Sequence, residues 1–131
     1  MVSRLEMVLK ELNENGNFRA SIFSTSTGLV LASQKADDVD ERVVAAMGSL
    51  LSDAAGKAAE EMNLSEPQVM KIFYKKDYII CRNIAINNQT SFLLAVLSKL
   101  PESDEVEKYI DQLLSWAVEN SQSDLEKLSS L

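Results

Sequence analysis

Four acidic residues that lie close together are the side chains of this sequence best suited to chemistry. They are Asp37, Asp38, Asp40 and Glu41. Hard divalent cations prefer carboxylate oxygens as ligands, but this spacing lacks the ligand series of an EF-hand loop. Aspartate is also favoured at a helix N-cap, so a solvated loop that ends in a cap at Asp40 explains the same residues. We therefore predict no metal site in this segment.

Nucleophiles and catalytic bases are sparse. The chain contains no histidine, and histidine is the commonest general base and metal ligand in enzymes. Cys81 is the only cysteine and lies in the apolar run IICRN, which favours a buried structural thiol over a reactive one. The glycines match neither of the phosphate-binding patterns G-x-G-x-x-G and G-x-x-x-x-G-K-S/T. We therefore predict that the protein is not an enzyme and uses no cofactor.

Length and charge narrow the class of protein further. A chain of 131 residues suits one domain with a modest core. The net charge of −7 argues against a nucleic-acid partner, because binding to phosphates depends on lysine and arginine. No apolar run approaches the roughly 20 residues that cross a bilayer, so we expect no membrane insertion. The first 14 residues contain acidic side chains and no continuous apolar stretch, unlike a signal peptide, and we expect a cytoplasmic protein.

The elements that hold these residues follow the order helix, two strands, helix, three strands, helix. The expected helices span 3–15, 40–62 and 104–120, and the expected strands span 18–23, 29–33, 68–74, 78–86 and 91–98. The last strand, SFLLAVLS, hardly alternates between apolar and polar residues, which predicts a central strand buried on both faces. We expect one domain over residues 1–120. The tail 121–131 then forms either a short amphipathic helix or a frayed end.

The helix expected over residues 40–62 has two uncharged faces of different kinds at about 100° per residue. The first carries bulky side chains and is made of Val43, Val44, Met47, Leu50, Leu51, Ala54, Ala58 and Met62. The second carries only small, uncharged residues, which are Ala45, Gly48, Ser49, Ser52, Ala55, Gly56 and Ala59.

Two glycines inside one helix require an explanation, because each costs roughly 1 kcal/mol relative to alanine. Close approach of another backbone would offset this cost. We therefore predict that the bulky face covers the sheet and that the small face packs against the same helix of a second subunit, in a two-fold dimer. A contact of the small face within the same monomer is one alternative. A solvent-exposed alanine and serine face is the other, since alanine is a good helix former.

The order of elements and three segments together resemble the roadblock/dynein light-chain family. The segments are STSTGLVLAS, DERVVAAMGSLLSDAAGKAAEEM and INNQTSFLLAVLS, within a resemblance that covers residues 3–120. The first hairpin turn of the family typically carries Asp-Gly, whereas this chain has Thr27-Gly28. The resemblance implies an α/β fold with a five-stranded antiparallel sheet. The middle helix would cover one face of that sheet, and the first and last helices the other.

The resemblance also implies a mode of association and a function. In the family the middle helices pack together and the edge strand after them pairs with its copy, which adds Val69, Lys71 and Phe73 to the expected interface. Family members are non-enzymatic platforms, and some bind small Ras-like GTPases. We therefore expect a homodimer, or a heterodimer with a paralogue, that binds and regulates such a GTPase. An adaptor with no effect on nucleotide turnover and a small-ligand sensor are the alternatives.

Overall fold

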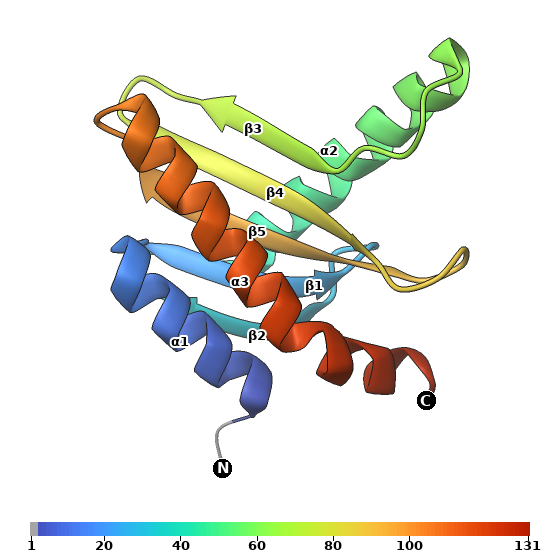
Figure 1. Cartoon of the computed structure of the whole chain (residues 1–131), viewed down its shortest axis with the longest axis horizontal. Helices are drawn as coiled ribbons and strands as arrows, with labels where there is room; N and C mark the ends of the chain where they lie inside the picture. Colours follow the sequence, from blue (N-terminus) through green and yellow to red (C-terminus); the bar gives the residue numbers. More distant parts are fainter. Residues whose placement is uncertain (1–2) are drawn as a thin grey trace.

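The computed structural model describes residues 3–131, and its eight elements follow the predicted order (Figure 1). The helices are α1 (Arg4–Gly16), α2 (Glu41–Met62) and α3 (Asp104–Ser129). The strands are β1 (Ala20–Thr25), β2 (Val30–Lys35), β3 (Val69–Phe73), β4 (Asp77–Ala85) and β5 (Ser91–Lys99). The predicted element order and fold class are therefore confirmed.

All five strands form one antiparallel sheet in the order β2-β1-β5-β4-β3. The central strand is β5, and its residues from Phe92 to Val96 are all buried, as the unbroken apolar run predicts. Helices α1 and α3 lie side by side on one face of the sheet, and α2 crosses the other face (Figure 1). The outer strands β2 and β3 leave two free sheet edges among the described residues.

The two faces of the sheet carry cores of unequal size. The larger core lies under α1 and α3 and contains bulky, fully buried side chains, among them Leu9, Leu12, Phe23, Tyr78, Ile80, Leu94 and Leu114. The smaller core lies under α2 and contains Ala20, Ile22, Val39, Val44, Ala45 and Ala95. Because most of the bulky side chains point to the α1 and α3 side, α2 meets a sheet surface with shorter side chains.

The loop before α2 behaves as a capped, solvated segment. The Asp40 side chain accepts a hydrogen bond from the Arg42 backbone N–H at 2.9 Å, which confirms the predicted N-cap. Hydrogen bonds from the Arg42 side chain and backbone lower the pKa of the Asp40 carboxyl. Asp38 forms an ion pair with Arg19 at 3.0 Å.

Helix α3 continues well past the end expected at residue 120. It runs to Ser129, and Leu125 is fully buried in the larger core. The core stripe continues through Ala117, Ser121 and Leu125 at intervals of four residues, but a serine occupies its middle position and is itself fully buried. The serine makes the apolar stripe look interrupted in the sequence, so the helix was expected to end at residue 120. In the structure, residues 121–129 form the last turns of α3.

Two single residues show how local sequence and packing agree or differ. Glycine is the usual left-handed residue at the end of a helix, but after α1 this residue is Asn17 (φ 53°) and not Gly16. Gly16 is instead required by packing, since a Cβ there would collide with the Phe18 ring. Cys81 is fully buried as predicted, and burial raises the pKa of its thiol to about 11. No helix within residues 3–131 combines the length and apolarity needed to cross a membrane.

Candidate functional site

The small-residue face of α2 lies against the chain's own sheet. Ala45, Gly48 and Ala59 are buried there. A Cβ at Gly48 would lie 3.3 Å from Cys81 Sγ and 3.8 Å from Ala95 Cβ, so glycine suits a position where the helix backbone lies close to the sheet. The prediction that this face is free to meet a second subunit was therefore wrong for Ala45, Gly48 and Ala59, although the close backbone approach that motivated it is present at Gly48.

The rest of the small-residue face is partly covered by the same chain. These residues are Ser49, Ser52, Ala55 and Gly56. Ser49 donates its hydroxyl to the Ser26 carbonyl at 2.9 Å, which fastens the β1–β2 turn to α2. The sequence reasoning assumed that the bulkiest face of a helix covers the core. Here a helix that crosses a sheet at short distance needs small side chains at the contact instead.

The bulky face of α2 is consequently the one that meets solvent. Leu50 is 70% exposed, Val43 56% and Met62 60%, whereas Val44 is buried. We call the exposed part the apolar flank of α2, which consists of Val43, Met47, Leu50, Leu51, Ala54, Ala58 and Met62. In a chain that is 25% charged, a continuous apolar row of this length is typical of an interaction surface.

The apolar flank of α2 adjoins the β3 side of the sheet. Met47 lies about 200° around the helix from Ser49, at 100° per residue, and Ser49 contacts the β1–β2 turn on the opposite side. On the neighbouring sheet surface, Met70 and Ile72 of β3 share a face with Cys81 and are only half-buried. The flank and these two side chains together form an apolar surface that the chain leaves partly uncovered.

Strand β3 presents unpaired backbone groups along its free edge. Asn83 donates its N–H to the Gln68 carbonyl, and Tyr74 donates to the Asp77 carbonyl. Because inward and outward groups alternate along an antiparallel strand, the N–H and C=O of Val69, Lys71 and Phe73 point away from β4. These are the three β3 residues that the family resemblance adds to the expected interface.

The side chain of Lys71 is held by two carboxylates of α3. Its Nζ lies 2.9 Å from Glu107 Oε2 and 3.0 Å from Asp111 Oδ1. Burial lowers the pKa of the Lys71 ammonium, but the hydrogen bonds to Glu107 and Asp111 outweigh it and the net shift is upward. The same hydrogen bond lowers the pKa of the Glu107 carboxyl. The centroid of the Phe73 ring lies 4.7 Å from that of Tyr78 in a stacked arrangement, and Phe73 itself is 55% exposed.

A Lys71→Met substitution is expected to raise the pKa of Glu107 toward its ordinary value. Because the folded-state pKa of Glu107 is lowered, its contacts stabilise the fold above the ordinary glutamate range, and this contribution is lost as the pH falls. Titration of the Glu107 carboxyl by NMR measures the shift. Lys57→Met, which removes the exposed Lys57–Asp53 pair, is the matched control and should leave Glu107 unchanged. An unaltered Glu107 pKa in Lys71→Met would contradict the assignment.

A family model and a known protein resemble this chain in sequence, the model over most of its length and the protein over about half. The family model named Roadblock/LC7 domain matches residues 4–99. A 63-residue stretch is 38% identical to the uncharacterized protein MJ0714 of Methanocaldococcus jannaschii; this stretch is 48% of the chain, and it spans about half (53%) of that relative's length.

Solved structures agree on the fold. Myxococcus xanthus MglB superimposes with a TM-score of 0.81 at 14% identity, over 95% of this chain and 97% of that one. A Roadblock/LC7 domain from Streptomyces avermitilis superimposes with a TM-score of 0.78 at 15% identity, over 94% of this chain and 98% of that one. The gliding protein mglB of Thermus thermophilus superimposes with a TM-score of 0.74 at 14% identity, over 92% of this chain and 87% of that one. Taken with the family model, which covers most of the sequence, this places the chain in the Roadblock/LC7 domain family.

Proposed function

We propose that the protein is a non-enzymatic, two-fold homodimeric platform in the cytoplasm that binds and regulates a small Ras-like GTPase. The observation that carries the pairing is the apolar flank of α2 beside the unpaired edge of β3. Exposed edge strands are templates for pairing with another chain, and an adjoining apolar surface would be buried in the same contact. A paralogue with the same two features could replace the second copy.

The free edge of β3 suits pairing with its own copy. The outward-facing residues Val69, Lys71 and Phe73 are symmetric about Lys71, so a two-fold axis there would set each Val69 opposite Phe73 of the partner subunit. Lys71 would then face its own copy, and like charges directly opposite destabilise a strand pair. Glu107 and Asp111 offset that charge within each subunit. The edge is thus compatible with a symmetric continuation of the sheet.

The position of α2 supports a second part of the proposed dimer contact, in which the α2 helices of the two subunits pack together. In such a dimer the α2 helix of the partner subunit would lie beside the apolar flank and over Met70 and Ile72. This arrangement removes the most exposed apolar side chains of α2 from water, at roughly 25 cal/mol for each Å² buried. One structure similar in fold carries the description "MglB with tetrameric arrangement", so assembly of that protein extends beyond a single chain.

Regulation of a GTPase by such a platform would be steric. A rigid paired surface that contacts the mobile switch loops of a GTPase would favour one of their conformations and so shift a population. Membership of the Roadblock/LC7 family supports this proposal, because the resemblance to this family implies a non-enzymatic platform of a kind that in some members binds small Ras-like GTPases. No group that enters the reaction is required from this chain.

A binding and turnover experiment tests the proposal. The chain is mixed with a small Ras-like GTPase from the same organism, encoded beside it where one exists. Binding is measured by calorimetry, and hydrolysis and nucleotide exchange are measured with and without the chain. Binding that depends on the bound nucleotide and changes either rate is expected. Binding with unchanged rates would favour the adaptor alternative, and the absence of both effects would overturn the proposal.

A further inference from the structure

The segments at the two ends of β3 carry opposite charge. Glu66 lies before the strand, and Lys75 and Lys76 lie in the turn that follows it, which we call the lysine turn. All three side chains are exposed, and none of them forms an ion pair within residues 3–131. The two signs are thus separated along one free sheet edge. Because the proposed dimer pairs through this edge, a role for these charges rests on that proposal.

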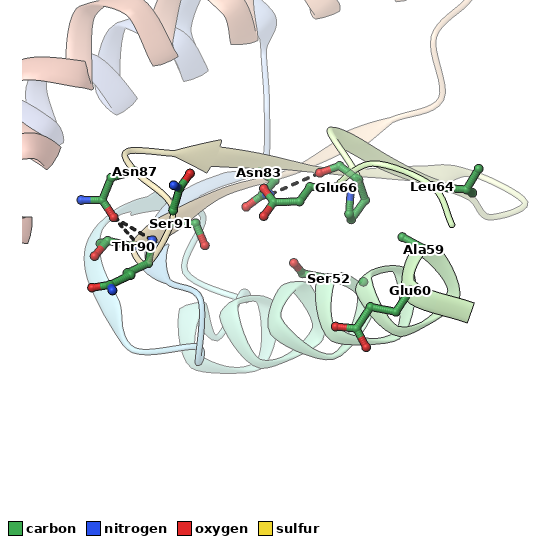
Figure 2. A pocket seen from close by; sticks show the side chains of 13 residues that line it. Ser52, Ala59, Glu60, Leu64, Glu66, Asn83, Asn87, Thr90 and Ser91 are labelled. Atoms are coloured by element: carbon green, nitrogen blue, oxygen red, sulfur yellow. Dashed lines mark hydrogen bonds between the residues drawn. The ribbon is translucent and has the colours of Figure 1, made fainter. Parts of the chain in front are cut away.

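The acidic end of the edge extends beyond Glu66. Glu66 and Glu60 both line a cavity of about 280 Å³ beside Gly56, whose walls are the C-terminal half of α2, the loop that follows this helix, and the β4–β5 turn (Figure 2). Among the described residues, no lysine or arginine lines this cavity. The last turn of α2 also lacks a basic residue, and the C-terminus of a helix carries a partial negative charge. The surface before β3 is therefore negative and uncompensated within the chain.

Hydrogen bonds hold both charged segments in line with the sheet. Asn83 of β4 donates its backbone N–H to the Gln68 carbonyl at 2.9 Å and its Nδ2 to the Pro67 carbonyl at 3.2 Å. At the other end of the strand, the backbone N–H of Leu100 donates to the Lys76 carbonyl at 3.2 Å. The acidic segment and the lysine turn therefore both lie at the ends of the β3 edge.

The symmetry of an antiparallel strand pair brings the acidic end of one copy to the basic end of the other. A two-fold axis at Lys71 lets the three outward-facing residues, Val69, Lys71 and Phe73, pair among themselves. Moving the axis by one residue would leave one of the three facing a residue outside the strand. Glu66 precedes Lys71 by five positions, and Lys76 follows it by five. The axis at Lys71 therefore brings Glu66 of each copy beside the lysine turn of the other, twice in one dimer.

We propose that Glu66 forms ion contacts with the lysine turn of the partner subunit, and that these two contacts select which chain can pair with this one. Ion pairs between exposed side chains add little affinity, but like charges at the same position exclude a wrong partner. A second copy of this chain satisfies both contacts. A paralogue could replace it only with the same order of charges, an acidic residue before its edge strand and lysines after it.

A charge exchange between two variants separates this selection from dimerisation itself. Glu66→Lys is one variant, and Lys75→Glu combined with Lys76→Glu is the other; the replaced side chains are all exposed, so both variants should fold. Each homodimer then has two repulsive contacts, and its dissociation constant should rise about tenfold. A mixed dimer of the two variants has two attractive contacts instead. An equal mixture should therefore consist mainly of the mixed dimer, whereas random pairing gives about half.

Native mass spectrometry measures the share of mixed dimer when one variant is labelled with ¹⁵N. The matched control makes the same charge changes at exposed residues of α1 and of the last turn of α3, as Glu11→Lys mixed with Lys10→Glu/Lys127→Glu, and should pair at random. No enrichment of the mixed dimer at the edge, or equal enrichment in the control, would overturn the charge contacts while a dimeric unmodified chain keeps the proposed dimer. An unmodified chain that stays monomeric at every concentration would overturn both.

Discussion

A Leu50→Glu variant is expected to be a folded monomer. Leu50 is 70% exposed in the single chain, so the substitution removes little from the core of that chain. In the proposed dimer the same side chain would be buried against the second copy. An unpaired charge there costs about 3 kcal/mol, so the dissociation constant should rise at least about 100-fold. Light scattering after size exclusion measures the mass, and circular dichroism checks the fold.

Met7→Glu is the matched control for this experiment. Met7 is 60% exposed on α1, on the other face of the sheet, and the same change of charge there should leave the dimer intact. If Leu50→Glu still formed a dimer of undiminished affinity, the apolar flank of α2 would not be the pairing surface. Equal dissociation of both variants would show instead that added negative charge alone drives the subunits apart.

Gly48→Leu is expected to destabilise the fold by about 3 kcal/mol, because it forces a large side chain into a tight contact between α2 and the sheet. Gly56→Leu, in the same helix, should stabilise the fold by up to about 0.8 kcal/mol through helix propensity alone. The opposite signs follow from the surroundings of the two glycines. A Cβ at Gly48 meets Cys81 at 3.3 Å, and one at Gly56 meets nothing within 4 Å.

Urea unfolding measures the free energy of unfolding of both glycine variants. The protein concentration is kept the same throughout, since the stability of a dimer depends on concentration. The comparison is internal, because both substitutions replace glycine by leucine within one helix. Equal losses of stability in the two variants would contradict the described packing of α2. So would a Gly48→Leu variant as stable as the unmodified chain.

The sequence predicted the elements of the fold well, and for physical reasons. The unbroken apolar run of β5 requires burial on both faces, and this placed it at the centre of the sheet. Turn residues and helix caps such as Asp40 marked most of the boundaries. The end of α3 was missed because Ser121 occupies a core position, and a polar residue there hides the continuation of the stripe to Leu125.

The two faces of α2 could not be assigned from the sequence alone. The periodicity correctly separated a bulky face from a small one, but which face meets the sheet depends on how closely the helix approaches it. That distance is set by neighbours such as Cys81 and Ala95, which are remote in sequence. The cavity beside Gly56 was missed for the same reason, since its walls come from three segments that only the fold brings together.

Pairing through the β3 edge is tested most directly by amide hydrogen exchange on the unmodified chain. The N–H groups of Val69, Lys71 and Phe73 point away from β4, whereas those of Met70 and Ile72 point toward it and serve as internal controls. Pairing of two copies predicts that the three outward amides become protected as the protein concentration rises. Rapid exchange of these three amides at every concentration, beside protected Met70 and Ile72, would contradict a dimer formed through this edge.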